Sequence, residues 1–315
     1  MTNDRLKLLA DNISQVIIGK AEVTELLLTS LLAGGHCLID DVPGVGKTKL
    51  ANALARSLGI DFKRIQFTPD LQPADITGIY FYNQKDGQFQ FRAGPIFTHV
   101  LLADEINRAV PRTQSSLLEA MEEQQVSIEG TTFPLAQPFL VIATQNPLEL
   151  EGTFPLPEAQ LDRFLLKIEM GYPTLKQEVE ILSRFKERDP LQELKPVFHG
   201  EDIVALRQEV TKVHLTRDLL AYIAGLAEAT RQNRHLQLGL SPRGSLALMR
   251  ASLAYAYIKR RSFVLPDDIK YLFPYVAGHR LILAYDSAYH SSKAELIQEI
   301  LARVPVPTED VLHES

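Results

Sequence analysis

Cysteine, tryptophan and long apolar runs are nearly or wholly absent from this chain. Its 315 residues include one cysteine, Cys37, and no tryptophan. A single cysteine excludes an internal disulfide and a cysteine cluster for a metal, so we expect Cys37 to be a small core residue. No run approaches the roughly 18 apolar residues that a spanning helix needs, and the N-terminus lacks the pattern of a secretion signal. We therefore expect a cytoplasmic protein without membrane insertion.

A basic block is also missing. The 33 lysines and arginines are mixed along the chain with 39 acidic residues, which leaves a net charge of −6. Binding to nucleic acid needs a local excess of positive charge to neutralise phosphates, so this pattern disfavours nucleic acid as a partner. The eight histidines lack the spacing of metal ligands, and we predict no metal beyond Mg²⁺ held with a nucleotide. The hydrophobic content of 45% suffices for two modest globular domains.

What the sequence does contain is a phosphate-binding turn within residues 36–50. An apolar strand runs into a glycine-bearing turn and then into a helix with leucines at four-residue spacing. The residues that we predict to bind nucleotide here are Gly44, Val45, Gly46, Lys47, Thr48 and Lys49. The glycines let backbone N–H groups approach a polyphosphate, Lys47 places a charge on the β/γ-phosphates, and Thr48 offers a hydroxyl to Mg²⁺. The alternative is a chance GKT sequence in a strand-turn-helix connection.

One residue of this turn departs from the usual pattern, and an apolar loop precedes it. The P-loop pattern expects a glycine where this chain has Asp41, so that carboxylate must point away from the phosphates or weaken binding. Upstream, residues 5–34 predict two helices that are broken at Ile18, Gly19 and Lys20. An apolar loop there is well placed to cover an adenine ring, and the nucleotide contacts predicted in this loop are Ile18 and Gly19. An ordinary turn is the alternative.

A second chemical motif lies at residues 99–105, where a buried strand ends in two adjacent carboxylates. Asp104 fits the carboxylate that holds Mg²⁺ through its water shell, and Glu105 fits the base that polarises the attacking water. A strand that simply runs into an acidic helix start would give the same letters. The P-loop about sixty residues upstream favours the catalytic interpretation.

Three further residues are candidates for catalysis. Asn146 follows the apolar run 139–144, where its amide can bond the attacking water or the γ-phosphate, or merely satisfy a turn. Arg163 either forms a local salt bridge or projects across a subunit boundary onto another subunit's γ-phosphate. Arg243 begins a helix after Ser241, a predicted N-cap, and is either a solvated first-turn arginine or directed at the phosphates by a lid closed over the sheet.

The secondary-structure pattern predicts an α/β fold. Buried strands are expected at residues 36–40, 62–67, 99–103, 139–144 and 164–169. Strands that alternate with helices indicate a parallel, doubly wound sheet. Residues 79–92 and 126–133 predict two hairpins. The aromatic residues of the first hairpin either form an exposed contact surface or pair with one another across the strands.

Past residue 172 helical periodicity dominates and no further buried strand is expected. We therefore place a nucleotide-binding core at 1–172 and an all-helical lid domain at 173–315. Helices are expected at roughly 174–188, 200–211, 216–231, 242–260, 266–277 and 292–302.

The motifs together resemble those of the MoxR family of AAA+ ATPases over nearly the whole chain. They read, in order, DVPGVGKT, FTPDLQPADITG, HVLLADEINRA, ATQNP, LPEAQLDRF and LSPRG. By this resemblance Asp104 and Glu105 form the Walker B motif, and Asn146 is sensor 1. Arg163 is the arginine finger acting in trans, and Arg243 is sensor 2. Residues carried over for nucleotide and Mg²⁺ are Lys47 and Thr48.

The resemblance also implies an architecture and a cellular role. It implies a hexameric ring of five-stranded cores with helical lids, in which the insert 77–97 and the hairpin segment 125–138 face a central pore. It implies chaperone-like maturation or assembly of other proteins, often with a partner that bears a von Willebrand factor A-type domain. The leading hypothesis is therefore an ATPase that remodels protein clients. The alternatives are a nucleic-acid-directed ring motor or loader subunit, and a nucleotide-gated scaffold without turnover.

Overall fold

The centre of the molecule is a five-stranded sheet. The computed structural model describes residues 2–146, 152–186, 188–285 and 292–307. In spatial order the strands are β2 (Phe62–Gln66), β5 (Val100–Asp104), β8 (Leu140–Gln145), β1 (Cys37–Asp40) and β9 (Leu166–Ile168). Every neighbouring pair is parallel. The predicted parallel α/β sheet is therefore confirmed, and the ends of β5, β8 and β1 meet at one edge of the sheet.

Both faces of the sheet are covered because successive strand residues point to opposite sides. Cys37 and Ile39 pack with α1 (Thr2–Ser14), α2 (Ala21–Leu32) and α3 (Lys47–Ser57), whereas Leu38 packs on the opposite face with α5 (Pro111–Glu123). Cys37 is fully buried, as expected. Leucines of α3 at four-residue spacing are equally buried, so the helix that follows the phosphate turn is anchored firmly on the sheet.

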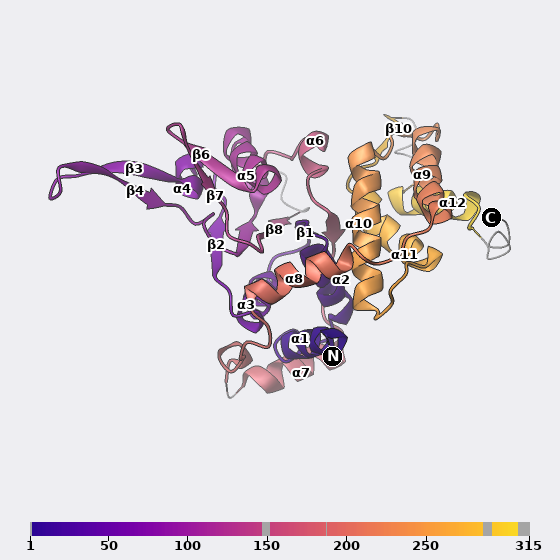
Figure 1. Ribbon diagram of the computed structural model, residues 1–315, viewed down its shortest axis with the longest axis horizontal. Helices are drawn as coiled ribbons and strands as arrows, with labels where there is room; N and C mark the ends of the chain where they lie inside the picture. Colours follow the sequence, from indigo (N-terminus) through magenta and orange to yellow (C-terminus); the bar gives the residue numbers. More distant parts are fainter. Residues whose placement is uncertain (1, 147–151, 187, 286–291, 308–315) are drawn as a thin grey trace.

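Two hairpins extend from the core, as predicted. The first pairs β3 (Gly78–Asn83) with β4 (Gln88–Ala93), and the second pairs β6 (Gln125–Ile128) with β7 (Thr131–Pro134). The β3–β4 hairpin follows the short helix α4 (Pro73–Thr77) and projects well beyond the body of the molecule (Figure 1).

The C-terminal part is mainly helical. It contains α7 (Leu175–Phe185), α8 (Gly200–Val210), α9 (Arg217–Arg231), α10 (Pro242–Ile258), α11 (Pro266–Ala277) and α12 (Lys293–Arg303). These agree with the expected helices to within a few residues, and residue 187 of the first expected helix lies outside the described residues. The lid also contains β10 (Leu236–Leu238) and β11 (Ile282–Leu283), which pair in a small antiparallel ribbon that was not predicted. Its residues are mostly exposed or half-buried, so no further buried strand is present among the described residues, as expected. Strands this short carry no recognisable period.

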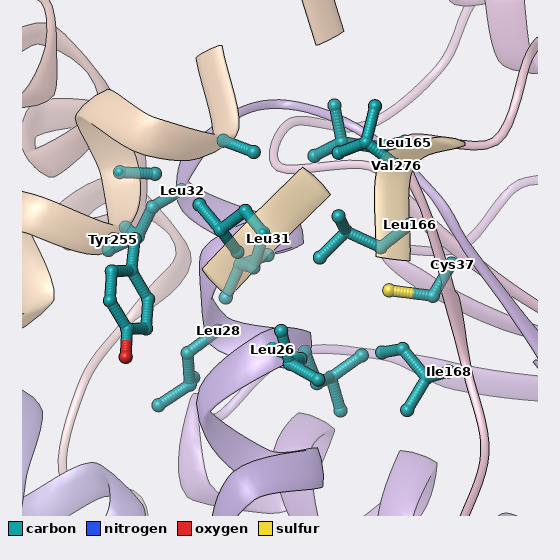
Figure 2. Close-up of a cluster of buried hydrophobic side chains, with 14 of the residues drawn as sticks. Leu26, Leu28, Leu31, Leu32, Cys37, Leu165, Leu166, Ile168, Tyr255 and Val276 are labelled. Carbon is teal, nitrogen blue, oxygen red and sulfur yellow. The ribbon is translucent and has the colours of Figure 1, made fainter. Parts of the chain in front are cut away.

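Lid helices pack directly on the core. Figure 2 shows leucines of α2, among them Leu31, against Leu166 of the edge strand β9, Tyr255 of α10 and Val276 of α11. Residues of the sheet, α2 and the lid helices belong to one buried cluster. This packing places the first turn of α10 beside the segment between α6 (Glu158–Leu161) and β9. The proposed division between residues 172 and 173 stays a prediction.

Candidate functional site

The turn between β1 and α3 is shaped to receive an anion. Gly44 and Gly46 have φ of +86° and +97°, and nothing lies within 4 Å of the position that a Cβ would occupy at either residue. Other residues rarely adopt such φ values, and the free space on this side admits a ligand close to the backbone. Helix α3 begins at Lys47, so its unpaired N–H groups and positive dipole end lie at the same turn. The residues therefore fit a polyphosphate.

A cavity of about 610 Å³ opens at this turn. It brings together ten of the residues predicted to bind or act on nucleotide: Ile18, Gly44, Val45, Gly46, Lys47, Thr48, Lys49, Asp104, Glu105 and Asn146. Asn146 is also nearly buried there, and Pro147, which follows it in the motif, lies outside the described residues. Gly19 is not among the described lining residues. Gly19 has φ of +71°, which side-chain-bearing residues rarely adopt, so the backbone turn explains its place in the loop.

Part of the cavity lining is apolar. Ile18 contributes from the loop between α1 and α2, and Pro173, Ile181 and Phe185 contribute from the segment around α7. A flat, weakly polar ring is a suitable occupant beside such side chains, whereas the phosphate turn contributes polar groups, among them Lys47. Ile18 was predicted to lie there, whereas nothing in the spacing of the α7 residues relates them to the P-loop.

Asp41 points away from the cavity's phosphate turn. Its Oδ2 accepts hydrogen bonds from the backbone N–H groups of Met170 (2.7 Å) and Gly171 (2.6 Å), and its Oδ1 accepts one from Val42 (2.8 Å). The side chain thus fixes the chain as it leaves β9. Of the two outcomes considered for this carboxylate, the structure shows the one that leaves the phosphate turn free.

Lys47 lies in the polar part of the cavity lining. Its Nζ donates to the backbone carbonyl of Asp41 at 2.7 Å. Burial lowers its pKa below the ordinary value of lysine because the charged ammonium loses water, while Asp104 and neighbouring carboxylates oppose that shift. The ammonium is therefore incompletely compensated where it lies, and an anionic ligand would improve its environment.

Thr144 organises the two carboxylates at the end of β5. Its hydroxyl donates to Asp104 Oδ1 at 2.6 Å and accepts from the backbone N–H of Glu105 at 2.8 Å. Glu105 has φ of +56°, an uncommon left-handed conformation for a residue with a side chain, and the Thr144 hydrogen bond helps to hold it. Thr144 was not among the predicted site residues, although its position at the polar end of an apolar strand indicates a role there.

Strand β2 supplies two further contacts that sequence analysis missed. Arg64 pairs with Asp104 Oδ2 through Nη2 (2.6 Å) and Nε (3.0 Å) and also lines the cavity. Gln66 donates its Nε2 to Glu105 Oε2 at 2.6 Å. These contacts depend on β2 lying beside β5, which the order of the strands in the sequence does not reveal.

Arg163 and Arg243 lie together on one carboxylate. Arg163 Nε is 3.0 Å from Glu122 Oε2, and Arg243 Nη2 pairs with the other oxygen, Oε1, of the same side chain. Neither arginine is among the described residues that line the cavity. A lid that directs Arg243 at the phosphates of its own chain is therefore not seen. The reason is that the N-cap residue Ser241 bonds to Asp162, which keeps the start of α10 beside α6.

Among the helices in the described ranges, none combines the length and apolar character required to cross a bilayer.

Comparison with known proteins agrees with these features. Residues 36–166 match the family described as ATPase family associated with various cellular activities (AAA), and residues 228–300 match the AAA lid domain. The chain is 39% identical to a protein from Cytophaga hutchinsonii that is named as an ATPase, with a TM-score of 0.92 over 98% of this chain and 96% of that one.

Several relatives align with nearly the whole chain. The chain is 50% identical over 300 residues to the protein YeaC of Bacillus subtilis, covering 95% of this chain and 94% of the relative. It is 41% identical over 305 residues to Chaperone MoxR1 of Mycobacterium tuberculosis, covering 94% and 80% respectively. Protein MoxR of Methylorubrum extorquens is 32% identical over 93% of its own length. The chain therefore belongs to the MoxR family of AAA+ ATPases.

Proposed function

We propose that this chain hydrolyses ATP in a hexameric ring, where each nucleotide site takes catalytic residues from two subunits, and that hydrolysis drives chaperone-like remodelling of client proteins. The observation that carries the proposal is the placement of the arginines. The cavity holds the lysine and both carboxylates that ATP hydrolysis needs, whereas Arg163 and Arg243 lie together elsewhere, at Glu122.

Within one subunit, the residues of the cavity have distinct tasks. The backbone from Gly44 to Gly46 and the ammonium of Lys47 bind the phosphates. Thr48 and Asp104 would hold Mg²⁺, which when bound would neutralise phosphate charge. The backbone N–H of Lys49 belongs to the first turn of α3, where the anion is bound.

Glu105 acts as the base that orients and polarises the attacking water. Thr144 fixes the backbone of Glu105 and the carboxylate of Asp104 through one hydroxyl, so the two acids are held in a set relation before substrate arrives. Asn146, nearly buried in the same cavity, is the candidate to bond the water or the γ-phosphate as sensor 1.

Arg163 and Arg243 act on the nucleotide of a neighbouring subunit. Their side chains are 28% and 43% exposed, so both retain access to solvent while they pair with Glu122. Exposed ion pairs of this kind are weak, about 0–1 kcal/mol, and a phosphate on a neighbour can replace Glu122 as the partner. We assign both residues to the subunit boundary.

The projecting hairpin is the proposed client contact. Its Tyr82 and Phe89 are 55% and 71% exposed, a high fraction for aromatic side chains on a narrow β-ribbon. The name of the mycobacterial relative, a chaperone, supports protein clients. A partner with a von Willebrand factor A-type domain remains part of the proposal.

A mixing experiment tests the subunit boundary. We expect Arg163→Ala to spare ATP binding and to lower ATPase activity by ~10³-fold or more, because the cation that stabilises the transition state is lost. Mixing it with Lys47→Ala subunits should restore part of the activity, since some boundaries then pair an intact P-loop with an intact finger.

The dependence of ATPase activity on protein concentration provides a second test. Activity per subunit should rise steeply as the wild-type protein is concentrated into rings. Activity that stays constant down to clearly monomeric protein, or an Arg163→Ala loss that mixing leaves unchanged, would overturn the proposed ring mechanism.

A further inference from the structure

The backbone on both sides of Arg163 is held by a single side chain of the lid. Arg280, which follows α11, donates from Nη2 to the carbonyl oxygens of Asp162 (3.1 Å) and Phe164 (2.6 Å). Its Nη1 also donates to the carbonyl of Val276 within the lid. One guanidinium thus spans from the lid to the two residues that flank the proposed finger.

The carboxylate of Asp162 extends this connection to the second arginine. Asp162 Oδ1 accepts from Arg280 Nε at 2.6 Å, and its Oδ2 accepts from the Ser241 hydroxyl at 2.8 Å. Ser241 is the N-cap of α10 and also accepts from the backbone of Gly244. Arg243 lies in the helical turn that this cap fixes, so both arginines are attached to the same group of hydrogen bonds.

Burial makes the arrangement rigid. Arg280 is only 4% exposed, and the cost of burying its charge is offset by the Asp162 carboxylate and several carbonyl oxygens. Burial lowers the pKa of Arg280, while the pairing with Asp162 opposes the shift. A planar group with five donors can satisfy these acceptors at once, which a lysine cannot do.

We propose that Arg280 is a positioning residue that, through Asp162 and Ser241, holds Arg163 and Arg243 in one arrangement at the subunit boundary. Movement of the lid therefore moves both arginines together. The inference rests on the proposed function, in which these arginines act on a neighbour's nucleotide. It adds a lid residue that acts only through other residues and that sets the rate of ATP hydrolysis at the neighbouring subunit's site.

The test replaces Arg280 by lysine, which keeps the charge and removes the fork. We expect kcat to fall about 10- to 100-fold, the size of effect that a small misplacement of a catalytic group produces, while the KM for ATP changes less than about 3-fold. Mixing with Lys47→Ala subunits should restore activity. Backbone hydrogen exchange in residues 158–168 should accelerate in the variant without nucleotide, which reports the positioning independently of turnover.

Arg261→Lys is the matched control. Arg261 pairs with Asp268 at 2.6 and 2.7 Å in the same lid, beyond the opposite end of α10 from Arg243. Its replacement removes an equally short arginine–aspartate pair and should lower stability without changing exchange at 158–168 or kcat. If Arg280→Lys does no more than this control, the positioning role is wrong.

Arg163→Ala separates failure of the inference from failure of the proposed function. Rescue of Arg163→Ala by mixing, without rescue of Arg280→Lys, would show that Arg280 is merely structural. If Arg163→Ala is not rescued either, the trans mechanism itself fails. Unchanged exchange at 158–168 in Arg280→Lys would overturn the inference in either case.

Discussion

Asp41 shows how one side chain can depart from a motif without harm to it. The carboxylate occupies the position where the P-loop pattern expects glycine, yet its oxygens accept from backbone N–H groups of Met170, Gly171 and Val42. It joins the phosphate turn to the chain that leaves β9 for the lid. The residue is 8% exposed, so water offers little replacement for these bonds.

Restoring the usual glycine should therefore weaken the protein. Asp41→Gly leaves three backbone N–H groups, that of the buried Met170 among them, without this acceptor and should lower the free energy of unfolding by about 2–4 kcal/mol, measured by urea denaturation. ATP affinity should not improve. Asp41→Asn, which keeps one carbonyl acceptor, should lose less, and equal stability of the glycine variant and the wild type would contradict the assigned role.

Lys47 and Glu105 should separate binding from turnover. Lys47→Ala removes the cation at the phosphate turn, so ATP affinity should fall sharply. Glu105→Gln keeps the shape of the side chain and an oxygen that can accept from Gln66, but it removes the base. ATP should therefore bind while turnover falls ~10²–10⁴-fold. Equilibrium binding of a fluorescent ATP analogue, beside phosphate release, distinguishes them. Undiminished hydrolysis by Glu105→Gln would rule out Glu105 as the base.

At the level of elements, the two hairpins are joined by aromatic side chains. Phe91 of β4 stacks on Phe133 of β7 with ring centroids 4.6 Å apart, and Phe97 meets both rings edge-on. Across the first hairpin, Tyr82 also pairs with Phe89. The rings thus pair with one another across the strands, which confirms one of the two alternatives, and the outer ones are also exposed.

Phe133→Ala should release the first hairpin from the second. Aromatic contacts of this kind contribute about 0.5–1.5 kcal/mol beyond their buried area, so overall stability should fall modestly. Backbone hydrogen exchange at residues 78–93 should accelerate clearly. Phe89→Ala, which removes the exposed cross-strand pair with Tyr82 but no contact between the hairpins, is the control and should accelerate that exchange much less. Equal exchange in the two variants would mean that the stacking does not couple the hairpins.

For the whole molecule, a buried histidine couples folding to pH. Val141 donates its N–H to His36 Nδ1 at 3.0 Å, and His36 Nε2 lies 3.1 Å from the carbonyl of Met121, so the neutral ring protonated at Nε2 satisfies both groups. Burial lowers the pKa of His36 to about 4 from an ordinary 6.5, because the charged ring would lack water. The histidine joins the start of β1 to β8 and α5.

Acidification should therefore lower the stability of the folded protein. The unfolded chain takes up the His36 proton near pH 6.5 and the folded chain only near pH 4, so this contribution is complete above pH 6.5 and is lost as pH falls towards 4. We expect on the order of 2 kcal/mol to be lost at pH 5, measured by urea denaturation. His36→Gln should be less stable at pH 7 but less sensitive to acid. An equally steep pH dependence in the variant would exclude His36 as its source.

Local patterns in the sequence predicted most of the elements and the polar part of the cavity lining. The alternation of apolar runs with helical periods predicted the five strands. The sequences GKT and ADE predicted Lys47, Thr48, Asp104 and Glu105 as site residues, because each lies within or next to the element that positions it. Motifs of this kind depend on contacts between near neighbours in the chain. The short antiparallel ribbon in the lid was not predicted, because its strands have too few residues to show a period.

Only the tertiary structure decided which distant residues complete the site. Thr144, Arg64 and Gln66 reach the two acids because β8 and β2 flank β5, and strand order is set by how the whole chain packs. From the sequence alone, Arg163 and Arg243 each had two alternative roles. Their meeting at Glu122 follows from the lid packing against α2 and β9, a long-range contact that no local pattern records.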